Sequence, residues 1–117
     1  MNFQKMIVWQ KSMTLAEKVY EAVRFLPKEE LFALSYQMRR AAVSVPSNIA
    51  EGVARATKND TKYFLTIARG SVAELQTHIL ICKRLKYIEE EQARILLDLA
   101  DEIRKMLSVL INKENLI

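Results

Sequence analysis

Apolar residues recur at alternating three- and four-residue steps along most of this 117-residue chain, and this spacing constrains its fold more than any other feature. It places apolar side chains on one face of an α-helix. With only 2 glycines and 2 prolines, the chain has few turn-forming residues and therefore few, long elements. Short connections make consecutive helices antiparallel. The pattern predicts an all-α protein, an up-down-up-down antiparallel four-helix bundle in one domain over residues 1–117.

The four expected helices cover residues 8–26, 29–56, 60–86 and 87–110. Pro27 separates the first two, because its ring cannot continue a helix but fits the start of the next. The polar segment "ATKND" at residues 56–60 is the expected loop before the third helix. The rows expected to form the core are Val8, Ser12, Leu15, Val19, Ala22 and Leu26; Leu31, Leu34, Met38, Ala41, Val45, Asn48 and Gly52; Leu65, Ala68, Val72, Leu75, Ile79 and Cys82; and Leu96, Leu99, Ile103, Met106 and Leu110.

Pro46 lies in the middle of the second expected helix, where it leaves the carbonyl of Ala42 without its usual donor. The apolar row keeps its phase on both sides of the proline, which favours one continuous helix kinked at Pro46. The alternative is a break and a new helix, because Asn48 and Glu51 have the spacing of a capping box. We favour the kinked helix.

Two of the expected helices carry a second row of side chains beside the first. A wide apolar face on a small bundle is typical of a surface that meets another subunit, and we expect an oligomer. The alternative is that both rows face one broad core. The second rows are Trp9, Met13, Ala16, Tyr20 and Val23 in the first helix, and Phe64, Ile67, Ser71, Glu74, His78, Ile81 and Leu85 in the third.

The chain lacks the signals of export and membrane insertion. No apolar run is long enough to span a bilayer, and "MNFQKMIVWQKS" lacks the apolar stretch and cleavage site of a secretory signal. The single cysteine, Cys82, excludes an internal disulfide and fits a reducing compartment. We expect a cytoplasmic protein that does not bind a membrane.

Charge is distributed unevenly along the chain. Residues 1–30 contain 5 basic and 4 acidic residues, residues 31–88 contain 9 and 3, and residues 89–117 contain 4 and 7. The net charge of +4 is therefore concentrated in a basic middle block, while the C-terminal part is acidic.

Residues that commonly carry catalysis or hold metals form no convincing set. His78 is the one histidine, and Glu74 four residues before it would be its only neighbouring ligand. Cys82 lies in an apolar row, which indicates a buried, inert thiol. The chain has no GxGxxG motif, P-loop or nucleophile elbow. We expect no metal, no cofactor and no catalytic residue, and hence no enzyme.

Basic residues of the middle block follow two stripes. One stripe has heptad spacing on the third helix, and the other follows the second helix through Ser44, Ser47 and Glu51. These residues would follow a phosphate backbone, with little sequence preference. The alternative is an ordinary solvated face. The candidate nucleic-acid-binding residues are Arg40, Arg55, Lys58, Lys62, Arg69 and Lys83.

The segments "QMRRAAVSVPSNIAEG" and "FLTIARGSVAELQTHI" resemble the four-helix-bundle family of 23S ribosomal RNA intervening-sequence proteins, and "VWQKSMTLAEKVY" resembles that family's first helix. The resemblance covers residues 8–87 and implies a homopentamer with a central channel. Some members are encoded by insertions inside ribosomal RNA genes, and most have no established activity. A related branch, the accessory variability proteins of diversity-generating retroelements, binds nucleic acid and a reverse transcriptase.

The resemblance also implies structural roles for the motif around the proline. Pro46 would lie in a helix that bends around its neighbours, Asn48 and Glu51 would hold polar contacts near the bend, and Gly52 would allow close helix approach. Arg39 and Arg40 would either face an anionic partner or supply one ion pair to Glu74 at a helix or subunit contact. We favour the pair, because no basic residue lies three or four positions from Glu74.

Together these observations predict a non-enzymatic, cytoplasmic, pentameric helical protein with weak, salt-sensitive, sequence-nonspecific binding to RNA or DNA. The first alternative is a scaffold whose basic face docks an acidic partner protein, such as a reverse transcriptase. The second, which we favour least, is an enzyme with a site between subunits.

Overall fold

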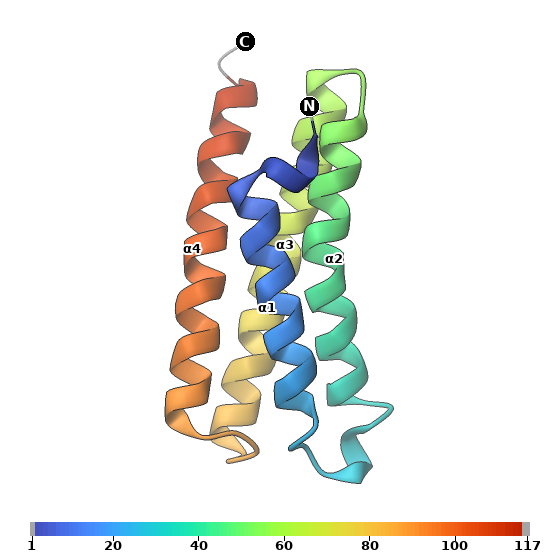
Figure 1. Cartoon of the computed structure of the whole chain (residues 1–117). Helices are drawn as coiled ribbons and strands as arrows, with labels where there is room; N and C mark the ends of the chain where they lie inside the picture. The colour runs from blue at the N-terminus through green and yellow to red at the C-terminus, as the bar shows by residue number, and fades with distance from the viewer. Residues whose placement is uncertain (1, 116–117) are drawn as a thin grey trace.

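The computed structural model describes residues 2–115 and the side chains of residues 2–113. Its elements are η1 (Phe3–Lys5), α1 (Ile7–Val23), η2 (Lys28–Glu30), α2 (Leu34–Ala54), α3 (Lys58–Arg84) and α4 (Glu90–Asn115). The four α-helices run alternately up and down in a bundle of 46 × 24 × 21 Å (Figure 1). The predicted all-α four-helix fold is confirmed, and residues 2–115 contain no strand. None of their helices combines the length and hydropathy needed to cross a bilayer.

The core lies along the bundle axis, where each helix packs against its chain neighbours and α1 also packs against α4. The predicted rows of the first and third helices are buried throughout. The predicted row of the fourth helix is off centre, since Leu99, Met106 and Leu110 are only partly buried. Alanines lie in the middle of the buried face of α4 because they let the helices pack closely, whereas a prediction from hydrophobicity alone places leucines there. The buried row of α4 is Ala93, Leu96, Ala100, Ile103, Leu107 and Ile111.

The second helix continues without interruption through Pro46, so a break and restart at this point is wrong. Asn48 caps no new helix. Its side-chain amide instead donates to the carbonyl oxygen of Ser44 at 2.8 Å and to the Ser44 hydroxyl at 2.9 Å. Pro46 itself is buried. The kink at Pro46 stays a prediction.

The connection between α1 and α2 is longer than predicted at both ends. Helix α1 ends at Val23 rather than at Leu26. Pro27 disfavours helical backbone angles at Leu26, the residue before it. Helix α2 begins at Leu34 rather than at residue 29. The chain between them forms only a short 3₁₀ turn, and Leu31 is 47% exposed instead of lying in the core.

The start of α2 has a cap that the sequence pattern does not reveal. Ala33, with φ −119° and ψ −104°, lies outside the helical region and has no side chain to cap the helix. The carboxylate of Glu30 accepts the Leu34 backbone N–H at 3.4 Å instead. An acidic group at this position also favours the helix dipole.

The connection between α2 and α3 covers residues 55–57, earlier in the chain than the predicted loop at residues 56–60. Thr57 is the N-cap of α3, and its hydroxyl accepts the backbone N–H of Asp60 at 3.1 Å. Lys58 therefore belongs to the first turn of α3 rather than to a loop. Helix α3 stops at Arg84, slightly before the predicted end, while α4 continues beyond the predicted end at residue 110.

The second row of α3 turns toward α2 over much of its length. His78 is buried, and the Ser71 hydroxyl lies 2.9 Å from that of Ser44 on α2. Its exposed members are Glu74 and, near the C-terminal end, the apolar Ile81 and Leu85. For most of α3, one broad internal contact therefore explains both rows. The second row of α1 differs, because Met13 and Tyr20 remain 39% and 46% exposed.

Candidate nucleic-acid interface

The six basic residues predicted to bind nucleic acid lie in separate places on the bundle. Arg55, Lys58 and Lys62 gather at the turn between α2 and α3. Arg40 lies about 22 Å from Arg55 along the helix, and Lys83 about 31 Å from Lys62, at 1.5 Å rise per residue. Three of the six therefore lie near this turn and within eight positions of one another along the chain.

The turn is tight because Gly52 has no side chain. A Cβ atom at Gly52 would lie 3.1 Å from the Cβ of Phe64 and 3.2 Å from the carbonyl oxygen of Thr61, closer than side chains normally pack. The Thr61 hydroxyl donates to the Gly52 carbonyl at 2.8 Å. These contacts hold the end of α2 against the start of α3.

An aromatic pair packs near the turn, and one of its rings lies against a basic side chain. The guanidinium of Arg55 lies 4.7 Å from the centre of the Phe64 ring and 3.5 Å from the Glu51 carboxylate. Tyr63 packs edge-on against Phe64, with ring centres 5.2 Å apart, and is 61% exposed. An exposed ring among cations provides a stacking surface for an unpaired base. Sequence reasoning missed Tyr63, although an aromatic residue directly after Lys62 was the available signal.

Lys58 reinforces the positive potential of the turn. It is exposed, lies in the first turn of α3 and has no ion pair among the described residues. Unsatisfied backbone N–H groups give the start of a helix a partial positive charge, which adds to that of the lysine. Asp60 is the acidic residue of the same turn.

The remaining candidates do not extend this cluster into a continuous track. Arg69 donates to the hydroxyl of Ser108 on α4 at 3.3 Å, so the heptad stripe of α3 borders α4. The stripe of α2 borders the opposite side of α3, as the pair of Ser44 and Ser71 shows. The two stripes are therefore separated by the body of α3.

The two arginines of the motif make no ion pair with Glu74 among the residues that the structure describes. The guanidinium of Arg40 lies 5.8 Å from the centre of the Tyr36 ring. Arg40 and Glu74 do line one hollow of about 270 Å³ between α2 and α3. The favoured pair is thus not formed within the chain, and a pair of Arg39 or Arg40 with Glu74 across a subunit contact stays a prediction.

Two buried side chains that could in principle be reactive, Cys82 and His78, lie in surroundings typical of a role in packing. Burial raises the pKa of the Cys82 thiol to about 11, and its Sγ lies 3.5 Å from the sulfur of Met38, so it is a poor nucleophile. His78 has a buried Nδ1 without a hydrogen-bond partner. Burial lowers its pKa, and the nearby Glu74 carboxylate partly opposes that effect. Within residues 2–113, no three His, Cys, Asp or Glu side chains are grouped to hold a metal.

Comparison with known proteins identifies the same family that the sequence motifs resemble. The family model described as 23S rRNA-intervening sequence protein matches residues 4–109. A solved structure, a protein of unknown function from the S23 ribosomal protein family of Bacteroides thetaiotaomicron VPI-5482, is 27% identical with a TM-score of 0.84. The alignment covers 90% of this chain and 98% of that one. No curated protein matches the chain.

Proposed function

Because the chain belongs to the 23S rRNA-intervening sequence protein family, we propose that it is a non-enzymatic, cytoplasmic homopentamer that binds nucleic acid weakly. Phosphate contacts would supply most of the affinity and little sequence preference. Single-stranded RNA or DNA fits this surface better than a duplex, since an exposed ring can stack only on an unpaired base.

The observation that carries the proposal is the cluster at the α2–α3 turn. Arg55, Lys58 and Lys62 lie within eight positions of one another along the chain, and the exposed Tyr63 follows Lys62 directly. One such cluster has too few charges for tight binding. Five copies in one assembly would multiply contacts that are weak in a single chain.

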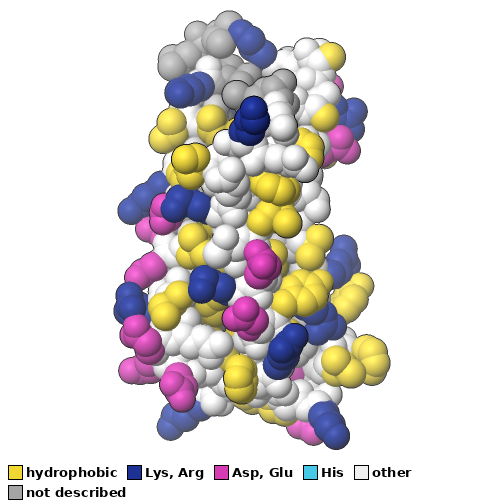
Figure 2. Space-filling view, in the orientation of Figure 1, with side chains coloured by type: hydrophobic (Ala, Val, Ile, Leu, Met, Phe, Trp, Pro, Cys, Tyr) yellow, Lys and Arg dark blue, Asp and Glu magenta, His cyan; other side chains and the backbone are white. Residues whose placement is uncertain are grey.

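An exposed apolar strip between α1 and α2 supports the oligomer. Met13, Tyr20, Tyr36 and Val43 are each 39–46% exposed, and the last three line one hollow of about 360 Å³. Apolar side chains are scattered among charges on the face that carries α1 (Figure 2). Exposed apolar side chains that line one shared hollow are typical of subunit contacts.

The binding proposal is tested by fluorescence anisotropy with labelled single-stranded RNA and DNA across a salt series. The variant Lys58→Gln with Lys62→Gln should bind more weakly, and its log–log salt slope should fall by about 0.7 for each phosphate that it no longer neutralises. The matched control, Lys18→Gln with Arg24→Gln, removes the same charge from α1 and the residue that follows it, and should bind like the parent. Equal binding by both variants, or no parent binding at low salt, would refute the proposal.

A second candidate function is a protein-interaction scaffold. The observation that favours it is the grouping of Tyr20, Tyr36, Arg39 and Arg40 around one hollow, because Tyr and Arg are enriched at the energetic centres of protein interfaces. Its partner would be an acidic protein surface, such as that of a reverse transcriptase. Arg39→Gln would weaken that binding and leave nucleic-acid binding unchanged.

A further inference from the structure

The outer side of α3 is almost free of charge along its central part. A surface helix usually carries charged and polar residues on its solvent side, but residues 70–82 contain one residue with a formal charge, Glu74. Leu80 and Ile81 of this stretch are 46% and 39% exposed. An exposed helix side of this kind is typical of a surface that another subunit covers. We define the α3 face as the exposed residues of this stretch, which are Gly70, Ala73, Glu74, Thr77, Leu80 and Ile81.

No contact inside the chain requires glycine at position 70. A Cβ atom at Gly70 would meet nothing within 4 Å, and no glycine in the described part of the chain has a positive φ. Glycine within a helix is destabilising relative to alanine. Its lack of a side chain lets the backbone of a second molecule come close. Gly70 therefore agrees with a close contact on the α3 face, whereas Gly52 is covered by α3 of its own chain.

A hollow lined by cations lies on the outer side of α2, next to α1. This is the hollow of about 360 Å³ described above, and it contains two guanidinium groups, two tyrosine rings and no carboxylate. Neither arginine forms an ion pair within residues 2–113. We call it the arginine hollow, and its lining residues are Tyr20, Tyr36, Arg39, Arg40, Val43 and Ser44.

The carboxylate of Glu74 has no cationic partner in its own chain. Glu74 and Arg40 line a smaller hollow between α2 and α3, but no ion pair joins them among the described residues. The Arg40 guanidinium lies near the Tyr36 ring instead. Burial lowers the pKa of His78, one turn from Glu74, so the imidazole does not balance this negative charge at neutral pH. The one carboxylate of the α3 face is therefore complementary to the arginine hollow of another molecule.

We propose that the α3 face of one copy packs against the arginine hollow of the next copy. Glu74 pairs there with Arg39 and Arg40, and the apolar side chains of the α3 face contact the two tyrosine rings. Glu74 and Ile81 are seven positions apart, about 10.5 Å along α3, and Tyr36 and Val43 have the same separation on α2. The two helices can therefore lie side by side over two turns. The proposal rests on the homo-oligomer of the proposed function and specifies its contact.

The two surfaces lie on different sides of the bundle. Helices α1 and α3 each pack against α2 and α4 but not against one another, so they occupy opposite corners (Figure 1). The arginine hollow is next to α1, whereas the α3 face is on α3. The contact is thus heterologous, and its repetition closes a ring when the rotation between copies allows it. A two-fold contact between two α3 faces would instead oppose like charges and leave the arginines uncovered.

The first test reverses the charge on each side of the contact and measures mass by light scattering after size exclusion. Glu74→Arg alone, and Arg39→Glu with Arg40→Glu, should each lower the mass toward the 13.5 kDa of one chain. Mixed in equal amounts, the two variants should associate again, because each hollow then meets a face of opposite charge. An ion pair within one chain cannot produce this recovery. Glu21→Arg, the same reversal at an exposed position of α1, is the control and should keep the parent mass.

The outcomes separate this contact from the oligomer itself. A monomeric parent would refute the homo-oligomer and the contact together. An oligomeric parent whose mass neither reversal changes would refute the contact alone and leave the arginine hollow to an acidic partner protein. Dissociation of both variants without recovery on mixing would also overturn the pairing of these two surfaces.

The second test concerns the close approach at Gly70. Gly70→Gln places a long side chain on the α3 face, and glutamine favours a helix more than glycine does. The helix content measured by circular dichroism should therefore be retained while the mass falls. Thr14→Gln, which lengthens an exposed side chain of α1, is the control and should keep the parent mass. A parent-like mass for Gly70→Gln would contradict the close contact.

Discussion

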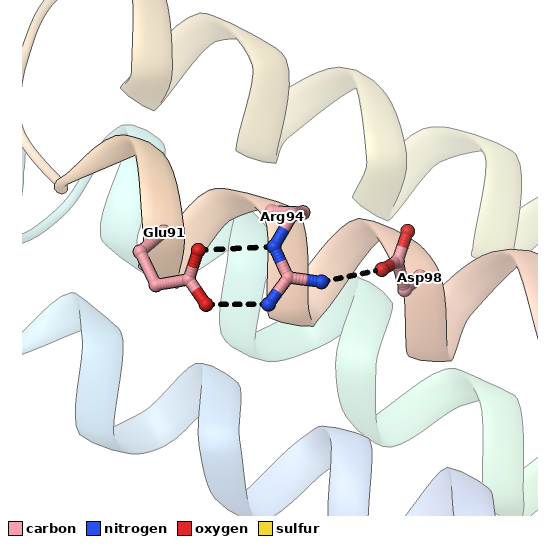
Figure 3. A network of polar contacts seen from close by, with 3 residues as sticks. All are labelled: Glu91, Arg94 and Asp98. Atoms are coloured by element: carbon pink, nitrogen blue, oxygen red, sulfur yellow. Dashed lines mark hydrogen bonds and ion pairs between the residues drawn. The ribbon is translucent and has the colours of Figure 1, made fainter.

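Helices α3 and α4 have nearly the same length, 27 and 26 residues, and each buries a continuous apolar row, but their charges are arranged differently. On α4, Arg94 binds the carboxylates of Glu91 and Asp98 (Figure 3). Arg104 and Lys105 of the same helix share Asp101. The hydrogen bonds from these basic side chains hold the pKa values of Glu91 and Asp101 below their usual range.

Three cations of α3 are not neutralised in this way within the described part of the chain. Lys58, Lys83 and Arg84 have no ion-pair partner among the described residues, and Arg69 donates to a neutral serine. Opposite charges three or four positions apart neutralise one another on a helix surface. Helix α4 has that spacing and α3 lacks it. The contrast indicates that two helices with the same role in the core can differ in whether their charge is available to a partner.

The largest expected effect tests the claim that the two helices are alike in the core. Ile79 on α3 and Ile103 on α4 are both fully buried. Ile79→Ala and Ile103→Ala should each lower the free energy of unfolding by about 2–5 kcal/mol, because each leaves a cavity. Denaturant unfolding at one protein concentration measures the change. A small effect at one site only would show that the cores are not equivalent.

The next prediction compares the contact between α2 and α3 with the exposed side of α3. A Cβ atom added at Gly52 would press against Phe64 and Thr61, whereas one added at Gly70 would find open space within 4 Å. Gly52→Ala should therefore destabilise the fold by about 1–3 kcal/mol through overpacking. Gly70→Ala should stabilise it by up to about 1 kcal/mol, because alanine favours a helix. Thermal unfolding of both variants checks the opposite signs, and two shifts of the same sign would contradict the close approach.

A smaller effect concerns the buried imidazole of α3. Burial lowers the pKa of His78 from 6.5, with Glu74 opposing the shift. The unfolded chain then binds the proton more readily than the folded chain, so stability falls as the pH drops below about 6.5 toward the folded-state pKa. His78→Gln, which does not titrate, should flatten this dependence. Melting temperatures across that range test it, and identical pH profiles for parent and variant would exclude His78 as the cause.

The smallest expected effect concerns the charges of α4. Arg94→Gln removes two exposed ion pairs and should lower the melting temperature slightly. The difference should disappear at about 1 M salt, where exposed charges are screened. Lys83→Gln on α3 should leave the melting temperature unchanged, because this lysine has no ion pair within the described residues. A larger decrease from Lys83→Gln would mean that the charges of α3 stabilise the fold.

Several features follow from the sequence because they depend on local spacing. The four helices, the buried rows of α1 and α3 and the continuity of α2 through Pro46 are all properties of one helix about its own axis. The gathering of basic residues in the middle of the chain is likewise visible in the sequence. An apolar period of three and four residues can be recognised without knowing where the neighbouring helices lie.

Only the tertiary structure decides how each helix is rotated against its neighbours. The apolar period predicted Leu99 and Met106 in the core of α4, but these side chains are only partly buried. Ala93 and Ala100 are fully buried instead, because small residues let the helices approach closely. The same rotation places the heptad stripe of α3 beside Ser108 and the stripe of α2 on the other side. At the α2–α3 turn, Arg55 lies over the ring of Phe64 because Gly52 permits a close approach of α2 to α3 there. Residues distant in sequence become neighbours through packing, which no local pattern encodes.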